Sequence, residues 1–145
     1  MSRIITLLVI FAIGAMPEAA ASEDESADSA LAWMLGCQGC HGADGRALGD
    51  EVPALKNTVA RFLSVPGGRE YLVQVPGVAM SPLEDEAIAQ LTNWMLTTMD
   101  SQHLPTGFRK YSAKEVGSLR KNPLGYDAAD VRAHLIGKNM ALFSN

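Results

Sequence analysis

Two cysteines and a histidine stand together in one short segment, Cys37-Gln38-Gly39-Cys40-His41, and the chain has no other cysteine. Because the two cysteines are so close in sequence, a disulfide framework cannot hold this fold together. On one helical turn their sulfurs face the same way and can form thioethers to the two vinyl-derived carbons of one porphyrin. The imidazole of the next residue then points at the iron. This pattern is typical of covalent attachment of a c-type haem.

Two other kinds of site use a pair of cysteines with this spacing. A thioredoxin-like dithiol follows a strand in a βαβ unit, and no strand pattern precedes Cys37. A zinc site needs a fourth ligand beside Cys37, Cys40 and His41. Only His103 and His134 remain to supply it, and there is no second pair of cysteines. Haem attachment is therefore the favoured interpretation.

Residues 1–21 have the three regions of a secretory signal peptide: one basic residue, an apolar run over 4–13, and small residues at 19–21. A retained membrane anchor is the alternative. A spanning helix, however, needs about 20 predominantly apolar residues, and Gly14 and Pro17 break this run. We therefore expect the signal to be cleaved and the mature protein to be in the periplasm without a membrane attachment. The periplasm is also the compartment in which haem is attached to such motifs.

The length of 145 residues predicts one folded domain. A formal net charge of −4 argues against a nucleic-acid binder, which normally carries a basic excess. Residues 22–29 are acidic and lack large apolar groups, so we expect a flexible leader there. Residues 101–145 carry a basic excess and residues 22–100 an acidic one. Such a division suits either a docking face or merely a solvated surface.

The hydrophobic pattern is helical and gives almost no strand signal, which predicts an all-α fold. Residues 84–99 form the clearest helix, because Pro82 suits its first turn and apolar residues repeat on one face. We expect shorter helices over residues 30–35, 59–63 and 70–75, a loop over 41–57, an irregular stretch over 76–82, and two short helices that begin at Ser112 and Asp127. Ser112 and Glu115 match the capping-box pattern.

This order of features resembles the class I c-type cytochromes. That family has an amino-terminal helix that leads into Cys-x-x-Cys-His-Gly, a loop with a proline, a methionine that supplies the sixth iron ligand, and a final helix that crosses the first. The matching features here are residues 30–35, Cys37 to Gly42, Pro53, Met80 and residues 84–99. The resemblance implies a cytochrome c fold over residues 30–100 around one covalently bound haem c. Residues 101–145 would form a C-terminal helical extension.

The resemblance also implies roles for three further residues. Trp33 and Trp94 stand where the family places the aromatic residues that pack at the crossing of the two helices. Pro53 resembles the loop proline whose carbonyl accepts a hydrogen bond from the ligand histidine. We expect the extension to pack on the core through apolar residues, namely Phe108, Tyr111, Leu119, Leu124 and Leu135.

Met80 is the expected second axial ligand of the iron, opposite His41. It lies in the irregular stretch just before the final helix, where the resembled family has its ligand. Met95 and Met99 repeat with apolar spacing on that helix and are better explained as core residues. His103 is the main alternative ligand, and a vacant sixth position is the other.

A methionine and a histidine together leave no open position on the iron for a substrate, and the thioether raises the reduction potential. The resemblance therefore implies a carrier of single electrons, cycling between Fe(III) and Fe(II), rather than an enzyme. Its partners would be a periplasmic dehydrogenase as donor and an oxidase or another cytochrome as acceptor. A haem enzyme or ligand-sensing module with an open or displaceable sixth ligand is the alternative, as is a subunit that relays electrons in a larger complex.

Overall fold

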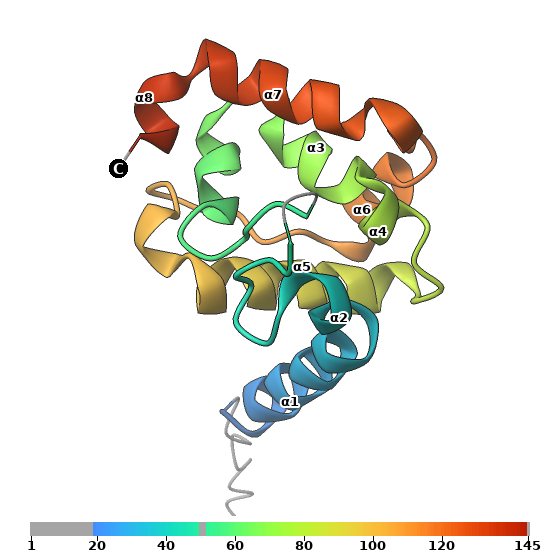
Figure 1. Ribbon diagram of the computed structural model, residues 1–145. Helices are drawn as coiled ribbons and strands as arrows, with labels where there is room; N and C mark the ends of the chain where they lie inside the picture. Colours follow the sequence, from blue (N-terminus) through green and yellow to red (C-terminus); the bar gives the residue numbers. More distant parts are fainter. Residues whose placement is uncertain (1–18, 50–51, 145) are drawn as a thin grey trace, which may run out of the picture.

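The computed structural model describes residues 19–49 and 52–144 of the chain. Over these residues the fold consists of helices and loops without a β-strand, which confirms the all-α prediction (Figure 1). The predicted signal peptide falls mostly on residues 1–18, outside the described part of the chain. None of the helices described has the length and apolar character needed to cross a bilayer.

One long central helix organises the arrangement. In Figure 1, α5 crosses the middle of the molecule, α1 and α2 lie on one side of it, and α3 and α7 lie on the other. In chain order the elements are α1 (Ala19–Gly36), α2 (Gln38–His41), the 3-10 helix η1 (Val59–Ser64), α3 (Gly68–Gln74), α4 (Pro76–Ala79), α5 (Asp85–Met99), η2 (Ser101–His103), α6 (Ala113–Leu119), η3 (Gly125–Asp127), α7 (Ala128–Lys138) and α8 (Met140–Phe143).

Helix α1 begins well before the expected position. We predicted an irregular, flexible leader over residues 22–29, whereas the structure has these residues inside α1. No glycine or proline interrupts residues 19–35, and alanine is the strongest helix former. Local helix propensity therefore prevails over the disorder that the composition favours.

Helix α5 agrees with its prediction to within one residue at its start. Met95 and Met99 are buried, as expected for core positions. Ser81 does not cap this helix; its Oγ accepts the Leu83 N–H in the preceding turn, and Glu84 stands at the N-cap without a side-chain hydrogen bond. The buried face of α5 thus forms the middle of the hydrophobic core.

The stretch of residues 76–82, predicted to be irregular, contains one turn of helix. Val75 is extended, as residues before proline usually are, and Pro76 starts α4 at the position where proline is best tolerated. Met80 follows as the C-cap residue of this turn, and its N–H donates to the carbonyl of Pro76 at 3.0 Å. A helical turn therefore sets the backbone direction at Met80.

The C-terminal extension shares the core of the preceding residues. Tyr111, Val116 and Leu135 are buried, and Phe108, Leu119 and Leu124 pack against the same cluster partly buried. The Leu124 N–H also donates to the carbonyl of Gln74 at the end of α3 (2.9 Å). The extension is therefore built into the folded body that contains α3 and α5.

Half of the predicted capping box forms at the start of α6. Ser112 Oγ accepts the N–H of Glu115 at 3.3 Å, as expected. The Glu115 carboxylate instead accepts hydrogen bonds from Arg69 (2.6 and 2.9 Å) and Arg109 (2.9 and 3.3 Å). Two charged donors compete successfully with one backbone N–H, because charge-assisted hydrogen bonds are the stronger kind.

Candidate functional site

The two cysteines lie on one continuous helical turn that follows α1. The N–H of Cys37 donates to Trp33 O at 2.9 Å, and the N–H groups of Cys40 and His41 donate to Cys37 O at 3.2 and 3.1 Å. Both thiols are free; that of Cys40 is exposed and that of Cys37 is half-buried. Burial raises the pKa of the Cys37 thiol, and the neighbouring Cys40 adds to this shift. Two free thiols thus share one turn.

A backbone carbonyl fixes the ring of His41. Its Nδ1 lies 3.2 Å from the carbonyl oxygen of Pro53, and this nitrogen must carry the proton, because a carbonyl only accepts. Burial lowers the pKa of His41, and the bond to Pro53 opposes that shift. The ring is therefore a neutral imidazole whose Nε2 lone pair is available, the form in which histidine binds metals.

Trp33 ties the first helix to both the cysteine turn and α5. Its indole N–H donates to the carbonyl of Ala43 at 3.1 Å, and only 3% of its surface is exposed. Its ring centroid lies 6.0 Å from that of His41 and 6.2 Å from that of Trp94. The two tryptophans therefore meet where α1 packs on α5, in the arrangement that the resemblance implied.

The loop after His41 folds back on the cysteine turn. Gly42 has a φ of 72°, a left-handed conformation that glycine adopts without strain, so the chain reverses directly after the histidine. The N–H groups of Ala47 and Leu48 then donate to the carbonyls of His41 (3.1 Å) and Cys40 (3.0 Å). The exposed Leu48 is thereby held next to Cys40.

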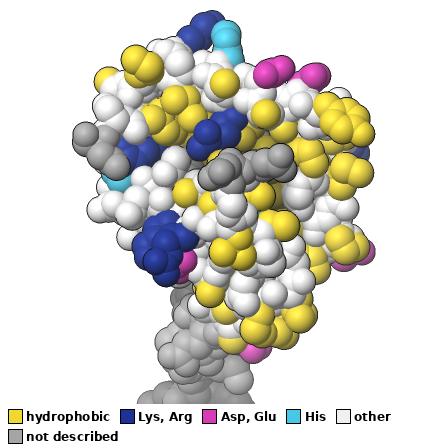
Figure 2. Space-filling model, in the orientation of Figure 1, with side chains coloured by type: hydrophobic (Ala, Val, Ile, Leu, Met, Phe, Trp, Pro, Cys, Tyr) yellow, Lys and Arg dark blue, Asp and Glu magenta, His cyan; other side chains and the backbone are white. Residues whose placement is uncertain are grey.

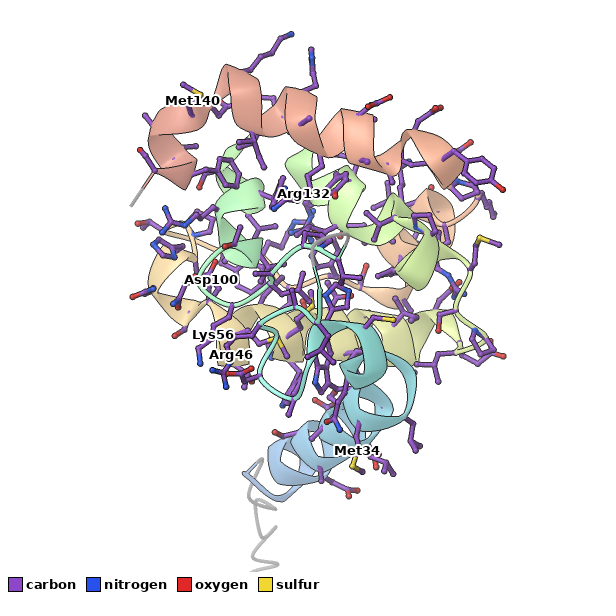
Figure 3. All side chains as sticks on the ribbon, viewed as in Figure 1. Met34, Arg46, Lys56, Asp100, Arg132 and Met140 are labelled. Carbon is purple, nitrogen blue, oxygen red and sulfur yellow. The ribbon has the colours of Figure 1, made fainter. Side chains whose placement is uncertain are left out.

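Large apolar side chains are exposed near the cysteine turn. Leu35, two positions before Cys37, and Leu48 are both exposed, and Met34 points outward from α1 (Figure 3). Figure 2 shows hydrophobic side chains on the surface at the end of the molecule formed by α1 and α2. Such apolar surface is suited to contact with a flat, largely apolar group or with a partner protein.

Met80 lies on the surface, immediately after α4, with 73% of its side chain exposed. Val78 on one side and Leu83 on the other are partly buried against the core. The backbone around Met80 is therefore anchored, while its thioether is accessible from outside the protein core. The pairing of Met80 with His41 on one iron stays a prediction of the family resemblance.

His103, the alternative ligand, is engaged elsewhere. Its Nδ1 binds Oδ1 of Asp100, and Oδ2 of that carboxylate accepts the N–H of Ala60 at 2.8 Å. Asp100 is 1% exposed and lies between η1 and the end of α5 (Figure 3). His103 is thus fastened to a buried carboxylate at the end of α5, and the preference for Met80 as the ligand rests on the family resemblance.

The two alternatives to haem attachment gain no support. Helix α1, rather than a strand, leads into Cys37. Within the described part of the chain, no group of three or more histidine, cysteine, aspartate or glutamate side chains is arranged to hold a metal ion. A thioredoxin-like dithiol and a zinc site therefore both lack their expected surroundings.

Comparison with known proteins gives a family. No protein family model matches the chain. A cytochrome c-552 of Thermus thermophilus is 31% identical to it over 106 residues, which cover 61% of this chain and 81% of the relative. A cytochrome c-552 from strain DSM 579 of the same species has the same identity over 106 residues, covering 61% of this chain and 72% of that relative. The chain belongs to the c-type cytochromes.

Membership among the c-type cytochromes implies binding of haem c and a role in electron transfer. The residues of this cytochrome fit that group on three observations. Two free thiols share one turn, a neutral imidazole presents its Nε2, and exposed apolar side chains flank the turn. Cys37, Cys40, His41 and Met80 are the residues that would hold the haem.

One residue near the site was not marked by any sequence pattern. Arg120, just after α6, donates hydrogen bonds to carbonyl groups on both sides of Met80. In the sequence it is simply one of the basic residues of 101–145. Its partners are mostly backbone oxygens, which every residue has, so no motif could have revealed it.

Proposed function

We propose that this cytochrome binds one haem c covalently through Cys37 and Cys40, with His41 and Met80 as axial ligands, and carries single electrons between exported redox proteins. The observation that carries the proposal is the cysteine turn followed by a histidine whose Nδ1 is bound to Pro53. When bound, haem c supplies a one-electron redox centre.

The cysteine turn provides attachment without an oxidant. Each thiol would add across one vinyl group of the haem, with the sulfur bonded to one carbon and the proton on the other, so that no electrons leave the system. Cys40 is exposed, and Cys37 is half-buried on the same turn. Their different burial supports an order of attachment in which Cys40 reacts more readily, because the accessible thiol is the better nucleophile.

His41 supplies the first axial ligand in a fixed orientation. The Pro53 carbonyl holds the proton on Nδ1, and the ring of Trp33 lies beside the imidazole. Such support raises the basicity of the ligand and prevents ring rotation. The ligand therefore needs little reorganisation when an electron arrives or leaves.

Met80 would supply the second ligand and would leave no open position on the iron for exogenous molecules. A neutral thioether favours the ferrous state and so raises the reduction potential. The accessible thioether of Met80, on a backbone whose neighbours Val78 and Leu83 pack against the core, supports this assignment. Two permanent protein ligands suit an electron carrier, whereas an enzyme or a sensor needs a free or displaceable position.

We propose the periplasm as the site of action, with a dehydrogenase as electron donor and an oxidase or another cytochrome as acceptor. The signal-peptide pattern of residues 1–21 supports export. Near the cysteine turn, the exposed Leu48 lies two positions after Arg46, and Arg46 and Lys56 both pair with Asp44 at 2.9 Å. A mixed apolar and charged surface supports weak, salt-sensitive docking.

The visible spectrum of the mature protein tests the ligand assignment. The oxidised wild type should have the weak band at the red end of the spectrum that marks sulfur bound to ferric haem, and Met80→Ala should abolish it. Met140→Ala is the matched control, because Met140 is 68% exposed but lies in the last helix. A wild-type protein without the band, or one whose ferrous form binds carbon monoxide rapidly, would favour the enzyme or sensor instead.

A further inference from the structure

The guanidinium of Arg120 contacts the backbone on both sides of Met80. Its Nε donates to the carbonyl of Ala79 at 3.2 Å, its Nη2 to that of Ser81, and its Nη1 to that of Leu83 at 2.9 Å. Nη1 also forms an ion pair with Asp85 Oδ1 at 2.8 Å. One side chain from the C-terminal extension therefore binds the stretch that carries Met80.

These contacts satisfy oxygens that the local structure leaves free. The last carbonyls of a helix have no partner within it, and Ala79 ends α4. A planar guanidinium has several N–H donors in a rigid fork, so it can bind several acceptors at once. The Arg120 side chain is 16% exposed, which keeps these hydrogen bonds largely away from water.

The other hydrogen bonds of this stretch are local. Met80 N–H donates to Pro76 O, Ser81 N–H to Val78 O, and Leu83 N–H to Ser81 Oγ. Bonds of this kind shape the turn but do not fix it relative to α5 and the rest of the protein. Apart from apolar packing, the hydrogen bonds of Arg120 are what hold this turn in place relative to α5.

Arg120 is itself held by close packing of α6 on α5. The side chain of Asn93 on α5 accepts the Tyr111 N–H at 2.8 Å and donates to the Tyr111 carbonyl at 2.9 Å. A Cβ atom at Gly117 would lie 2.1 Å from Oδ2 of Asp85, so a side chain there would displace the carboxylate that pairs with Arg120. The extension thus presents Arg120 from a well-determined position.

We propose that Arg120 is a positioning residue for the axial methionine: it holds the backbone of residues 79–83 so that the Met80 thioether stays directed at the iron. This inference rests on the proposed function. A neutral thioether binds ferric iron weakly, and residues that orient a ligand commonly change metal affinity by about 10–100-fold. Binding to both flanks of Met80 restricts the motion by which its sulfur would leave.

The test compares four holo-proteins of full length: wild type, Arg120→Ala, Arg120→Lys and Arg69→Ala. Arg69 is the matched control, because its guanidinium also fastens the extension, through Glu115 and the carbonyls of Arg109 and Lys110, but makes no described contact with residues 79–83. The readouts are the sulfur-to-ferric-haem band as pH is raised, the reduction potential, the rate of carbon monoxide binding to the ferrous form, and the melting temperature.

Arg120→Ala should lose the band at a pH lower by about one unit, and its carbon monoxide binding should be about tenfold faster than that of the wild type. Its reduction potential should also fall, because the thioether favours ferrous iron. Arg69→Ala should lower the melting temperature and leave the other three readouts unchanged. Arg120→Lys should give an intermediate result, because lysine keeps the charge beside Asp85 but cannot reach three carbonyls. If Arg120→Ala does not fold, this lysine variant carries the test.

Two outcomes overturn the inference, and they are distinguishable. If Arg120→Ala and Arg69→Ala have the same band, potential and carbon monoxide rate as the wild type, Arg120 stabilises the fold but does not position Met80. The proposed function then stands. If the wild type lacks the band, or Met80→Ala keeps it, the assignment of Met80 as ligand fails, and the role of Arg120 fails with it.

Discussion

The cysteine turn and the stretch around Met80 contribute opposite sides of the same proposed site, yet different kinds of contact fix them. Hydrogen bonds from close neighbours in sequence hold the cysteine turn: Trp33 binds Ala43, and His41 binds Pro53. The Met80 stretch is fixed by Arg120, about forty positions further along the chain. Covalent attachment should therefore not require the extension, whereas the proposed second axial ligand should depend on it.

The largest effect should come from the cysteine turn itself. The double variant Cys37→Ala/Cys40→Ala removes both thiols and should abolish covalent attachment completely. Haem should then be extractable into acidified organic solvent and absent from the denatured polypeptide on a gel. Gln38→Ala, between the two cysteines, should keep the haem attached; loss of haem in this control would mean that the turn needs more than its ligands.

Removal of the extension should separate the two halves of the site. A chain that ends at Gln102 loses the buried Tyr111, Val116 and Leu135 together with Arg120, so its free energy of unfolding should fall by at least about 3 kcal/mol. Thioether-bound haem should remain, while the sulfur-to-ferric-haem band should disappear. Chemical denaturation and the visible spectrum measure these effects. An unchanged band would show that Met80 binds the iron without the extension, and it would contradict the proposed difference between the cysteine turn and the Met80 stretch.

Trp33→Phe should test how firmly local contacts hold the cysteine turn. The substitution keeps an aromatic ring but removes the N–H that donates to Ala43, and it should destabilise the protein by about 1–3 kcal/mol because the carbonyl loses its partner. Trp94→Phe makes a comparable change in ring size on α5. A melting temperature for Trp33→Phe equal to that of the Trp94 variant would mean that the hydrogen bond contributes little.

The smallest effect should be a pH dependence of the stability that the packing of the extension on the core contributes. Arg69 and Arg109 lower the pKa of Glu115 from 4.5 to about 2. A carboxyl group with a lowered folded-state pKa stabilises the protein above its unfolded value, and this contribution is lost as pH falls from 4.5 towards 2. The melting temperature of the wild type should therefore fall more steeply in this range than that of Glu115→Gln. Parallel curves for the two proteins would contradict this role, and Glu86→Gln serves as a control outside the arginine cluster.

Features set by neighbouring residues were predictable from the sequence. The turn over residues 59–64, helix α5 and the N-cap at Ser112 all follow from apolar periodicity, proline positions and capping chemistry. The hydrogen bond between His41 and Pro53 was implied by a family resemblance and is present in the structure. In each case the decisive residues lie close together in sequence or belong to a known motif.

Features that depend on competition or on distant partners were not predictable. The acidic composition of residues 22–29 suggested a disordered leader, but continuity with the helix anchored by Trp33 makes them helical. Glu115 fits a capping box by spacing, yet Arg69 binds its carboxylate from a different helix. The contacts of Arg120 depend on how α6 packs on α5, which no single segment encodes.

Arg120 donates hydrogen bonds to the main-chain oxygens of Ala79, Ser81 and Leu83, so these bonds do not depend on which side chains occupy those positions. Substitutions at the small residues Ala79 and Ser81 leave the acceptors in place as long as the backbone keeps its path. Side-chain substitutions over this stretch are thus decoupled from the anchoring of its backbone, and the surface around Met80 can change in chemistry while one arginine keeps the main chain in position.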